Sequence, residues 1–235
     1  MHLDHTLVIG AGGSGGQLIP SLARLLAYHP NARASLTVAD GDAFEEHNQT
    51  RQLCGPSQLG RNKAEAMAEL CAAQGLDFVQ ACPKFLDKNG IRQQLHKLDR
   101  VLVISTVDND ATRKAVIDVL SERSGDWFHC TTGNADDSDG QQRISSSTHW
   151  HGVIDGEAVG LSPALLFPNI AEPSDVIPKQ GSCALAAPSS PQLISANALA
   201  ATMALLVVQN ALDGRLDPTC NSAFANGRNF KLTFS

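Results

Sequence analysis

A short apolar run followed at once by closely spaced glycines is the feature that most limits how this chain can fold. Residues 6–9 are β-branched or apolar, and residues 14–27 behind the glycines have the composition of a helix. Glycine permits a tight turn and lets backbone N–H groups approach an anion, which a helix N-terminus also attracts. The glycines are Gly10, Gly12, Gly13 and Gly15. This order of strand, turn and helix predicts a Rossmann-like nucleotide-binding unit, and a glycine turn without a ligand is the alternative.

An acidic residue ends the next apolar run. Residues 36–39 predict a second strand, and Asp40 stands at its C-terminal end, where a carboxylate can accept hydrogen bonds from ribose hydroxyls. Asp42 follows closely and is assigned to the same nucleotide site. An NAD-dependent dehydrogenase would carry the same glycines and the same acid, so these residues alone do not separate a dinucleotide from ATP.

Polar and basic side chains crowd the segment beyond this acid. Asn48, Arg51 and Gln52 lie close together, and Lys63 follows. Charge develops on pyrophosphate as it leaves ATP, and a guanidinium, an ammonium and an amide donor in a partly dry cleft would stabilise it. A dehydrogenase has no comparable need, so ATP used as a reagent is the leading hypothesis. The alternative is that Arg51 is a surface charge and Lys63 lies on the solvated face of a helix over residues 57–74.

A third apolar run, residues 101–105, leads into Asp108 and Asn109. Parallel strands bring their C-terminal ends to one edge of a sheet, so Asp108 should approach the glycine turn there. Mg²⁺ prefers oxygen ligands and commonly takes one or two carboxylates together with phosphates. Asp108 is therefore the predicted magnesium ligand, with Asn109 beside it in the nucleotide site. In the competing interpretation either residue only caps a helix over residues 110–124.

Together these motifs resemble the ThiF, MoeB and HesA family, the adenylating domains related to ubiquitin-activating enzymes. The matching motifs span about residues 6–113 and are Gly10-Ala-Gly-Gly-Ser-Gly15, Asp40-Gly-Asp42, Asn48-Gln-Thr-Arg51-Gln52, Gly60-Arg-Asn-Lys63 and Val107-Asp108-Asn109 with Arg113. The resemblance implies that Asp40 binds the ATP ribose and that Asp108 holds Mg²⁺. It implies that the triphosphate is contacted by Asn48, Arg51 and Lys63. The implied reaction is adenylation of the C-terminal carboxylate of a ubiquitin-like (β-grasp) or sulfur-carrier-like protein, with release of pyrophosphate.

The second half is most similar to the ThiF-related proteins of plasmid-borne PRTRC cassettes. The matches are Thr132-Gly-Asn134 with Gly140-Gln141, Gly181-Ser-Cys183, and Pro191-Gln192 with Ala196-Asn197. The chain departs from many relatives in two ways. Its six cysteines form no Cys-x-x-Cys pair, which predicts that there is no structural zinc. Its first strand begins by about Thr6, so the N-terminal arginine that reaches a neighbouring subunit's ATP is expected to be absent or supplied from elsewhere.

Cys183 is the candidate nucleophile for a second step. It lies within residues 162–191, which contain six prolines and are expected to form an extended surface loop. In the family a comparable crossover segment covers the incoming C-terminal tail, and a thiolate there could take the acyl group from the adenylate as a thioester. The alternative is a structural cysteine, since the nearest basic residue is Lys179. The first step needs no general base, because an ionised carboxylate is already a nucleophile.

Composition and patterning predict one α/β domain. The 235 residues are 43% hydrophobic and 18% charged, and strand-like and helix-like segments alternate up to about residue 132. This alternation predicts a mostly parallel sheet flanked by helices, with a nucleotide-binding half over residues 1–132. The substrate or crossover half, residues 133–235, should add antiparallel strands. Edge strands are expected at residues 141–147 and 148–154, and a hairpin turn at Asn226-Gly227.

Charge and hydropathy exclude other classes of partner. Lys and Arg number 18 and Asp and Glu 24, a net charge of −6 without a basic run, so no nucleic acid and no membrane is expected as a partner. The most apolar segment, residues 193–212, is interrupted by polar side chains and predicts a buried or interface helix that would contribute to a homodimer. Scattered cysteines and the lack of a signal peptide predict a cytoplasmic protein.

Two other polar clusters lack the spacing of metal ligands. His149 and His151 would lie on one face of a strand, for which a solvated sheet edge is expected. An acidic loop, expected to be a polar turn, contains Asp136, Asp137 and Asp139. Two alternatives to an adenylating enzyme stay open at this point: an NAD-dependent dehydrogenase, and a non-catalytic adaptor that only binds a ubiquitin-like partner.

Overall fold

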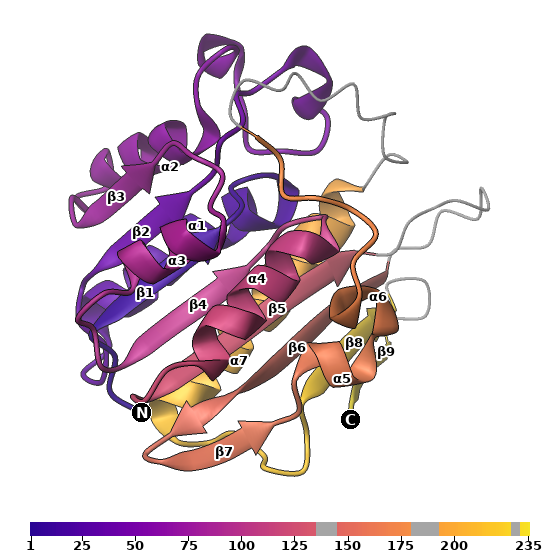
Figure 1. Ribbon diagram of the computed structural model, residues 1–235. Helices are drawn as coiled ribbons and strands as arrows, with labels where there is room; N and C mark the ends of the chain where they lie inside the picture. The colour runs from indigo at the N-terminus through magenta and orange to yellow at the C-terminus, as the bar shows by residue number, and fades with distance from the viewer. Residues whose placement is uncertain (135–144, 180–192, 227–230) are drawn as a thin grey trace.

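The computed structural model describes residues 1–134, 145–179, 193–226 and 231–235, which form a sheet with helices on both faces (Figure 1). The N-terminal strands are parallel and lie in the spatial order β3, β2, β1, β4, β5. They are β1 (His5–Ile9), β2 (Leu36–Ala39), β3 (Val79–Cys82), β4 (Val101–Ser105) and β5 (Trp127–Asn134). This order around β1 brings the ends of β1, β2 and β4 side by side.

Antiparallel strands extend the sheet beyond β5. β6 (Ser145–Ile154) pairs with β5, and β7 (Glu157–Gly160) and β8 (Ser222–Asn226) both pair with β6. β9 (Lys231–Phe234) pairs with β8, on the far side of the turn predicted at Asn226-Gly227; residues 227–230 lie outside the described residues. The predicted α/β fold, a parallel half with antiparallel additions, is therefore confirmed.

The position of β6 differs from the one expected. Residues 145–154 form one continuous strand inside the sheet instead of two edge strands. The edge that their local sequence leaves open is covered by β8, which comes from the far end of the chain and pairs with residues 145–149 of β6. Pairing between segments this far apart leaves no local pattern in the sequence.

The two faces of the sheet are covered by separate groups of helices. α1 (Gly13–Tyr28), α2 (Lys63–Ala72) and α7 (Ile194–Asp213) pack on one face, and α3 (Lys88–Gln94) and α4 (Asp110–Ser121) pack on the other. Successive residues of a strand point to opposite faces, so along β1 Val8 joins the first hydrophobic cluster and Leu7 the second. Burial on both sides explains why β1, β2 and β4 are mostly apolar.

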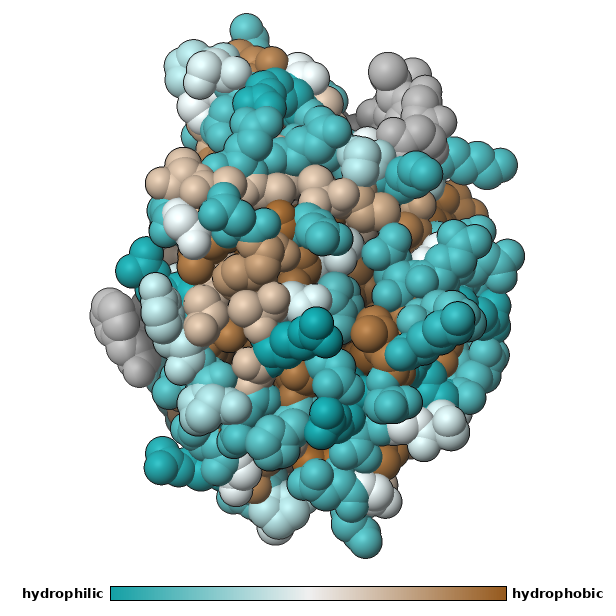
Figure 2. Space-filling view, turned by 90° about the vertical axis from the view of Figure 1, so that its left-hand side faces the viewer, coloured by the Kyte–Doolittle hydropathy of each residue, from teal (hydrophilic) through white to brown (hydrophobic). Residues whose placement is uncertain are grey.

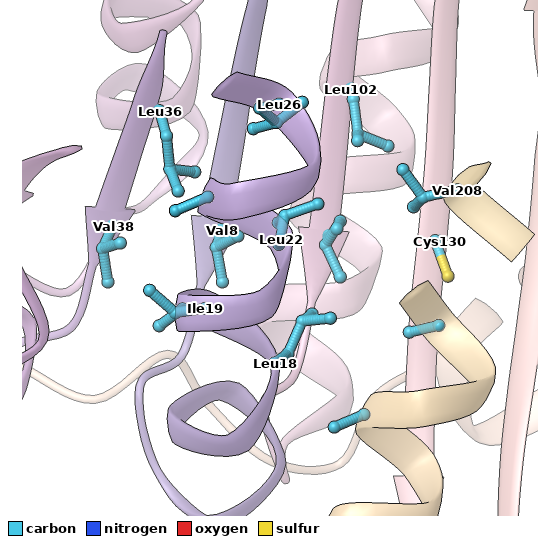
Figure 3. Close-up of a cluster of buried hydrophobic side chains, with 14 of the residues drawn as sticks. Val8, Leu18, Ile19, Leu22, Leu26, Leu36, Val38, Leu102, Cys130 and Val208 are labelled. Carbon is cyan, nitrogen blue, oxygen red and sulfur yellow. The ribbon is translucent and has the colours of Figure 1, made fainter. Parts of the chain in front are cut away.

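α1 shows how a helix is fixed on this sheet. Leu18, Leu22 and Leu26 are spaced by four residues, which places them on one face of the helix, and each is at most 1% exposed. Figure 3 shows these leucines directed at the sheet, among Val8 and Leu102. Burying side chains of this size stabilises the fold by roughly 1.5–3 kcal/mol each. The helix whose N-terminus follows the glycine turn is therefore rigidly placed.

α7 is the helix predicted over residues 193–212. Its length and composition would suffice for a membrane span, yet half of that stretch is buried within the protein. Small side chains such as Ala200, Ala204 and Ala211 are buried and let α7 approach α1, β5 and β6 closely. The expectation of a buried helix is confirmed, and α7 is a core helix of this fold.

The proline-rich segment is only partly the extended loop that was expected. Two one-turn helices, α5 (Pro163–Leu166) and α6 (Pro168–Ala171), form within it, each with proline at its first position. Proline is tolerated there because that N–H group has no partner inside a helix, and its fixed φ suits the first turn. Residues 180–192 of the segment, with Cys183, lie outside the described residues.

The C-terminal ends of the parallel strands meet at one edge of the sheet. Figure 1 shows that the N-termini of α1 and α4 and the long connection from β2 to α2 gather there. That connection contains two 3-10 turns, η1 (Glu46–Asn48) and η2 (Pro56–Gln58), so α2 begins later than the helix predicted over residues 57–74. The surface on the side of β3 is mostly hydrophilic, with smaller hydrophobic areas between the polar side chains (Figure 2).

Candidate nucleotide site

Two glycines of the turn are required by its own backbone. Gly10 has a φ of +101°, and a Cβ atom there would lie 2.9 Å from the carbonyl oxygen of Thr106. A Cβ atom on Gly15 would lie 2.1 Å from the carbonyl oxygen of Gly10. A side chain fits at neither position, so these glycines make the tight turn possible whether or not a ligand binds.

Gly12 and Gly13 differ from the other two glycines and from each other. A Cβ atom on Gly13 would lie 2.2 Å from Asn197 Nδ2, whereas the nearest atom to a Cβ on Gly12 is Gln52 Nε2, at an ordinary 3.7 Å. Gly12 is the N-cap of α1, which has no side-chain cap and no acidic residue in its first turn. The N–H groups at this helix end are therefore left for an anion, and a phosphate group fits there.

Asp40 directly follows β2 and is buried against the glycine turn. Its Oδ2 accepts a hydrogen bond from the N–H of Ala11 over 2.7 Å, and its Oδ1 accepts one from the N–H of Asp42 over 2.8 Å. Burial raises the pKa of this carboxyl group, against the opposing effect of the Lys63 ammonium and the two N–H donors. Asp40 thus ties the turn to β2. Each carboxylate oxygen can accept a further bond, so this role is compatible with the predicted ribose contact.

Lys63 is the first residue of α2 and is buried, with its side chain 9% exposed. Its ammonium donates to Asp42 Oδ2 over 3.2 Å. The solvated helix face that was the alternative for Lys63 is therefore wrong, because the helix begins where the chain turns back to the site. A buried lysine needs a carboxylate partner, and here Asp42 also fixes the direction of the Lys63 ammonium.

Sequence reasoning missed Asn62. Its Nδ2 donates to the carbonyl oxygens of Asp40 and Asp42 over 2.9 and 3.0 Å, and its Oδ1 accepts from the first N–H groups of α2. One side chain thus caps α2 and fastens it to the end of β2. An asparagine directly before a helix is a capping signal that the sequence does carry. Its hydrogen bonds to the carbonyl oxygens of Asp40 and Asp42 depend on the fold.

Asn48 and Gln52 are buried beside the turn, with 3% and 7% of their surface exposed. Asn48 Oδ1 accepts from the N–H of Glu45 over 2.9 Å, so this residue shapes its own loop. Gln52 Oε1 is buried and has no hydrogen-bond partner among the described residues. A buried acceptor without a donor is costly, so a donor group of a ligand would be stabilised there. Arg51 lies between them, half-buried, and its carbonyl oxygen accepts from Asn197 Nδ2 over 3.2 Å.

The loop after β4 joins the same edge. Thr106 Oγ1 donates to the carbonyl oxygen of Gly10 over 2.7 Å, which places Asp108, two residues later, near the glycine turn. Asp108 is exposed, and it makes no hydrogen bond or ion pair with any residue that the structure describes. A single exposed carboxylate suits a magnesium ion that takes its other ligands from phosphates and water. Asp108 is therefore a suitable ligand for a magnesium ion that binds together with the triphosphate.

The N-terminus of α4 is filled by side chains of the protein. Asn109 is its N-cap, and Asn109 Oδ1 accepts from the N–H group three residues later over 2.8 Å. Asp175, in the segment after α6, accepts from the N–H groups of Asp110 and Ala111, both over 2.7 Å. Asn109 has the capping role that the competing interpretation gave it. Arg113 donates to the carbonyl oxygens of Val107 and Thr132 and so fixes this loop to β5.

The structure describes the side chains of residues 1–134, 145–179, 193–226 and 231–235 that could bind a metal. None of their His, Cys, Asp and Glu side chains form a group of three or more that could hold a metal. Cys183 and the acidic residues Asp136, Asp137 and Asp139 fall outside these ranges.

The histidines of β6 lie in the core, and the expected solvated edge is wrong. His149 and His151 are each 5% exposed because β6 lies inside the sheet, where β8 pairs with it at His149 and β7 at His151. His151 Nε2 lies 3.0 Å from His129 Nδ1, and His129 Nε2 lies 2.9 Å from Ser105 Oγ. Burial lowers the pKa of both β6 histidines to about 4. They are neutral at physiological pH and form a polar layer inside the protein.

A model of the ThiF family matches residues 2–212, which is most of the chain. The chain belongs to the ThiF family. This membership agrees with the glycine turn, the acid after β2 and the polar loop that follows it. Among curated protein sequences, none matches this ThiF-family chain.

Several solved structures share the fold. PaaA has a TM-score of 0.63 at 16% identity, with 99% of this chain and 64% of that chain covered. E. coli MccB, crystallised with ATP, has a TM-score of 0.66 at 14% identity over 99% of this chain and 63% of that one. MccB crystallised with AMPCPP and MccA gives 0.65 at 13% identity, with 98% and 63% covered. At these identities the likeness is one of fold, and this ThiF-family chain spans about two thirds or slightly less of each relative.

Proposed function

We propose that this protein uses Mg-ATP to adenylate the C-terminal carboxylate of a ubiquitin-like (β-grasp) or sulfur-carrier-like protein. Membership of the ThiF family supports the reaction class. MccB, which has the same fold, was crystallised with ATP and also with AMPCPP and MccA together, which supports a site for a nucleotide beside a second ligand. Because the chain spans 63% of MccB, the substrate and the partner belong to the proposal.

The observation that carries the proposal is the convergence of four segments at one edge of the sheet. The glycine turn is bonded to Asp40 after β2 over 2.7 Å and to Thr106 after β4 over 2.7 Å. The same edge receives Lys63 from α2, through its 3.2 Å contact with Asp42. Direct hydrogen bonds thereby connect the uncapped end of α1, the segment that carries the buried Lys63 ammonium, and the loop that carries the exposed carboxylate of Asp108. A nicotinamide cofactor would need only the first of these.

Each group then has a part in the reaction. The N-terminus of α1 binds phosphate oxygens, Asp40 orients the ribose, and Gln52 Oε1 accepts from a donor of the ligand. An oxygen of the partner's carboxylate attacks the α-phosphorus, the bond from that phosphorus to the oxygen bridging to the β-phosphate breaks, and its electron pair leaves with pyrophosphate. Lys63 and Arg51 neutralise the charge that develops on this leaving group.

Positioning supplies the rest of the rate enhancement. Asp42 holds the Lys63 ammonium in place, and Asn48 shapes the loop that carries Arg51. Mg²⁺, when bound with the nucleotide at Asp108, contributes neutralisation of the triphosphate charge. Keeping the carboxylate and the α-phosphorus in line converts a bimolecular encounter into a reaction within one complex. The attacking carboxylate is already ionised, so none of the buried histidines is needed as a base.

Cys183 carries out the second step of the proposed reaction. Cys183 takes the acyl group from the adenylate as a thioester, with AMP as the leaving group. The protein acts as a homodimer in the cytoplasm, requires no structural zinc, and is related to the ThiF-like proteins of PRTRC cassettes. The glycine turn, Asp42, Asn48 and Gln52 bind the nucleotide together with Asp40.

Pyrophosphate exchange tests the proposal. With a small β-grasp protein ending in Gly-Gly, wild-type protein should exchange labelled pyrophosphate into ATP. Arg51→Ala and Asp108→Ala should each abolish the exchange. Cys183→Ala should leave the exchange intact and remove only a thioester. Matched controls are Arg33→Ala and Asp77→Ala, which remove exposed charges outside the site and should leave the exchange unchanged.

Three results would contradict the proposal. Equal exchange by wild type and Asp108→Ala would exclude the magnesium assignment. If titration calorimetry showed tighter binding of NAD than of ATP, the protein would be assigned as a dehydrogenase and not as an adenylating enzyme. ATP binding without exchange for any β-grasp protein would identify a non-catalytic adaptor instead.

A further inference from the structure

Asn197 is a polar side chain with no exposed surface that joins segments far apart in the sequence. It lies in the first turn of α7, and its Nδ2 donates to the carbonyl oxygen of Arg51 over 3.2 Å. Its Oδ1 accepts from Ser14 Oγ over 3.3 Å and from Asn134 Nδ2. One amide therefore links the glycine turn, the Arg51 loop and the end of β5 to α7.

Only an amide of this length satisfies all of these contacts. The oxygen end of Asn197 faces two donors and the nitrogen end faces a carbonyl oxygen, so both halves of the group are used. An aspartate would lose the bond to Arg51 and bury a charge, and a leucine of similar size would leave the donors and the carbonyl unpaired. The hydrogen bonds at position 197, and not only the space available there, therefore require asparagine.

Gly13 is shaped to receive this side chain. A Cβ atom on Gly13 would lie 2.2 Å from Asn197 Nδ2 and 2.5 Å from Asn197 Cγ. The missing side chain of Gly13 is therefore the space that Asn197 occupies. This assigns to Gly13 a function distinct from that of Gly12, whose Cβ direction is open.

We propose that Asn197 is a positioning residue for adenylate formation, which fixes the Arg51 loop relative to the N-terminus of α1. This inference rests on the proposed function. Asn197 touches no substrate in this proposal; it acts through the backbone of Arg51 and the hydroxyl of Ser14. With the amide in place, the residue that neutralises pyrophosphate and the helix end that binds the phosphates keep one relative geometry. Errors of about 1 Å in such geometry can lower rates about a hundredfold.

A double-variant experiment separates positioning from packing. Gly13→Ala should destabilise the protein because its new methyl group collides with Asn197, and Asn197→Ala in the same chain should recover part of the lost melting temperature by removing the collision. The kcat of pyrophosphate exchange should fall about ten- to a hundredfold in Asn197→Ala and in the double variant, with KM for ATP changed less than about threefold. Recovery of kcat together with the melting temperature in the double variant would overturn the inference.

Thr202→Ala is the matched control. Thr202 lies on the exposed side of the same helix, and among the described residues its hydroxyl bonds only to Ala198 one turn earlier, so its loss should leave kcat and KM unchanged. A drop in kcat in this control equal to that in Asn197→Ala would mean that any loss of α7 stability slows the reaction, and would contradict a specific role for Asn197.

Hydrogen exchange provides a readout that does not depend on activity. The backbone N–H groups of Arg51 and Gln52 both donate to the carbonyl of Asn48, so their exchange rates report the order of this loop. Asn197→Ala should accelerate their exchange at least about tenfold, and Thr202→Ala should not. Unchanged exchange in Asn197→Ala would overturn the inference, whereas a wild-type protein that exchanges no pyrophosphate would overturn the proposed function, so the two failures are distinguishable.

Discussion

Two helices present their N-termini at the same edge of the sheet, and the protein completes them in opposite ways. At α4, Asn109 is the N-cap, Asp110 adds an acid to the first turn, and Asp175 accepts from two N–H groups over 2.7 Å each. At α1, Gly12 is the N-cap, without a side-chain cap or an acid in the first turn. Side chains therefore satisfy the end of α4, whereas the end of α1 keeps its positive potential.

This difference separates residues that complete the fold from residues that are kept for a ligand. Leaving the glycine N-cap of α1 without a capping side chain costs roughly a few tenths of a kcal/mol. A phosphate group bound at α1 would offset that cost, because the N–H groups and the helix dipole both favour an anion. At α4, by contrast, Asp108 stands just before the capped end as an exposed carboxylate.

The largest expected effect concerns the backbone of the α1 turn. Gly15→Ala places a methyl group against the carbonyl of Gly10, where a Cβ would lie at 2.1 Å, and should lower the free energy of unfolding by about 3 kcal/mol. Gly12→Ala meets nothing closer than 3.7 Å and should stay within about 1 kcal/mol of wild type. Urea unfolding measures both. Equal stability of the two variants would mean that the turn is not closed as described.

The second effect is on nucleotide affinity. Gly12→Asp places a carboxylate at the N-terminus of α1, as Asp175 does at that of α4, and this carboxylate should repel phosphate and weaken ATP binding at least about tenfold, or about 1.4 kcal/mol. Gly12→Asn is the neutral control of the same shape and should weaken binding less. Titration calorimetry with Mg-ATP provides the measurement. An ATP affinity equal to that of wild type in Gly12→Asp would show that the phosphates bind elsewhere.

A smaller change is expected at the other helix. Asp175→Ala removes the carboxylate from the N-terminus of α4 and should destabilise the protein by about 1–2 kcal/mol, because two N–H groups lose a charged acceptor. Asp175→Asn keeps one acceptor and should recover part of this loss. Urea unfolding and ATP titration together decide its role. Loss of ATP affinity without loss of stability would move Asp175 into the nucleotide site and break the contrast between the helices.

The smallest effect is expected for Asn109→Ala. Removing the cap of α4 should lower the free energy of unfolding by about 1 kcal/mol and leave ATP affinity within about twofold of wild type. Thermal unfolding with and without Mg-ATP measures both quantities on one sample. A tenfold loss of ATP affinity would instead restore the nucleotide contact that the sequence suggests for Asn109.

The parallel half of the fold could be predicted because its signals are local. The apolar runs at residues 36–39 and 101–105 coincide with β2 and β4, and the glycines mark the beginning of α1. The position of β6 could not be predicted in the same way. Its neighbour β8 is supplied by residues about 75 positions later, as in the 73-residue separation of His149 and Ser222, so burial of the β6 histidines follows from the fold alone.

The residues of the candidate site differ in the same way, because some carry local sequence signals and others depend on long-range contacts. Asp40 and Lys63 could be placed from strand ends and motif spacing, and each is found beside the turn. Asp175 carries no such signal, and the motif that contains Asn197 does not reveal its partners, because their contacts cross 65 and 183 residues of sequence. An isolated aspartate or asparagine is compatible with any surface position, and only the packing of α6 on α4 and of α7 on α1 gives these two their partners.

The most direct test is a crystal structure of the protein grown with Mg-ATP. The phosphate oxygens should lie within hydrogen-bonding distance of the N–H groups at the start of α1, with the magnesium ion between them and Asp108. A nucleotide bound away from the glycine turn, or phosphates seated at the N-terminus of α4 after displacing Asp175, would contradict the assignment of this edge as an ATP site.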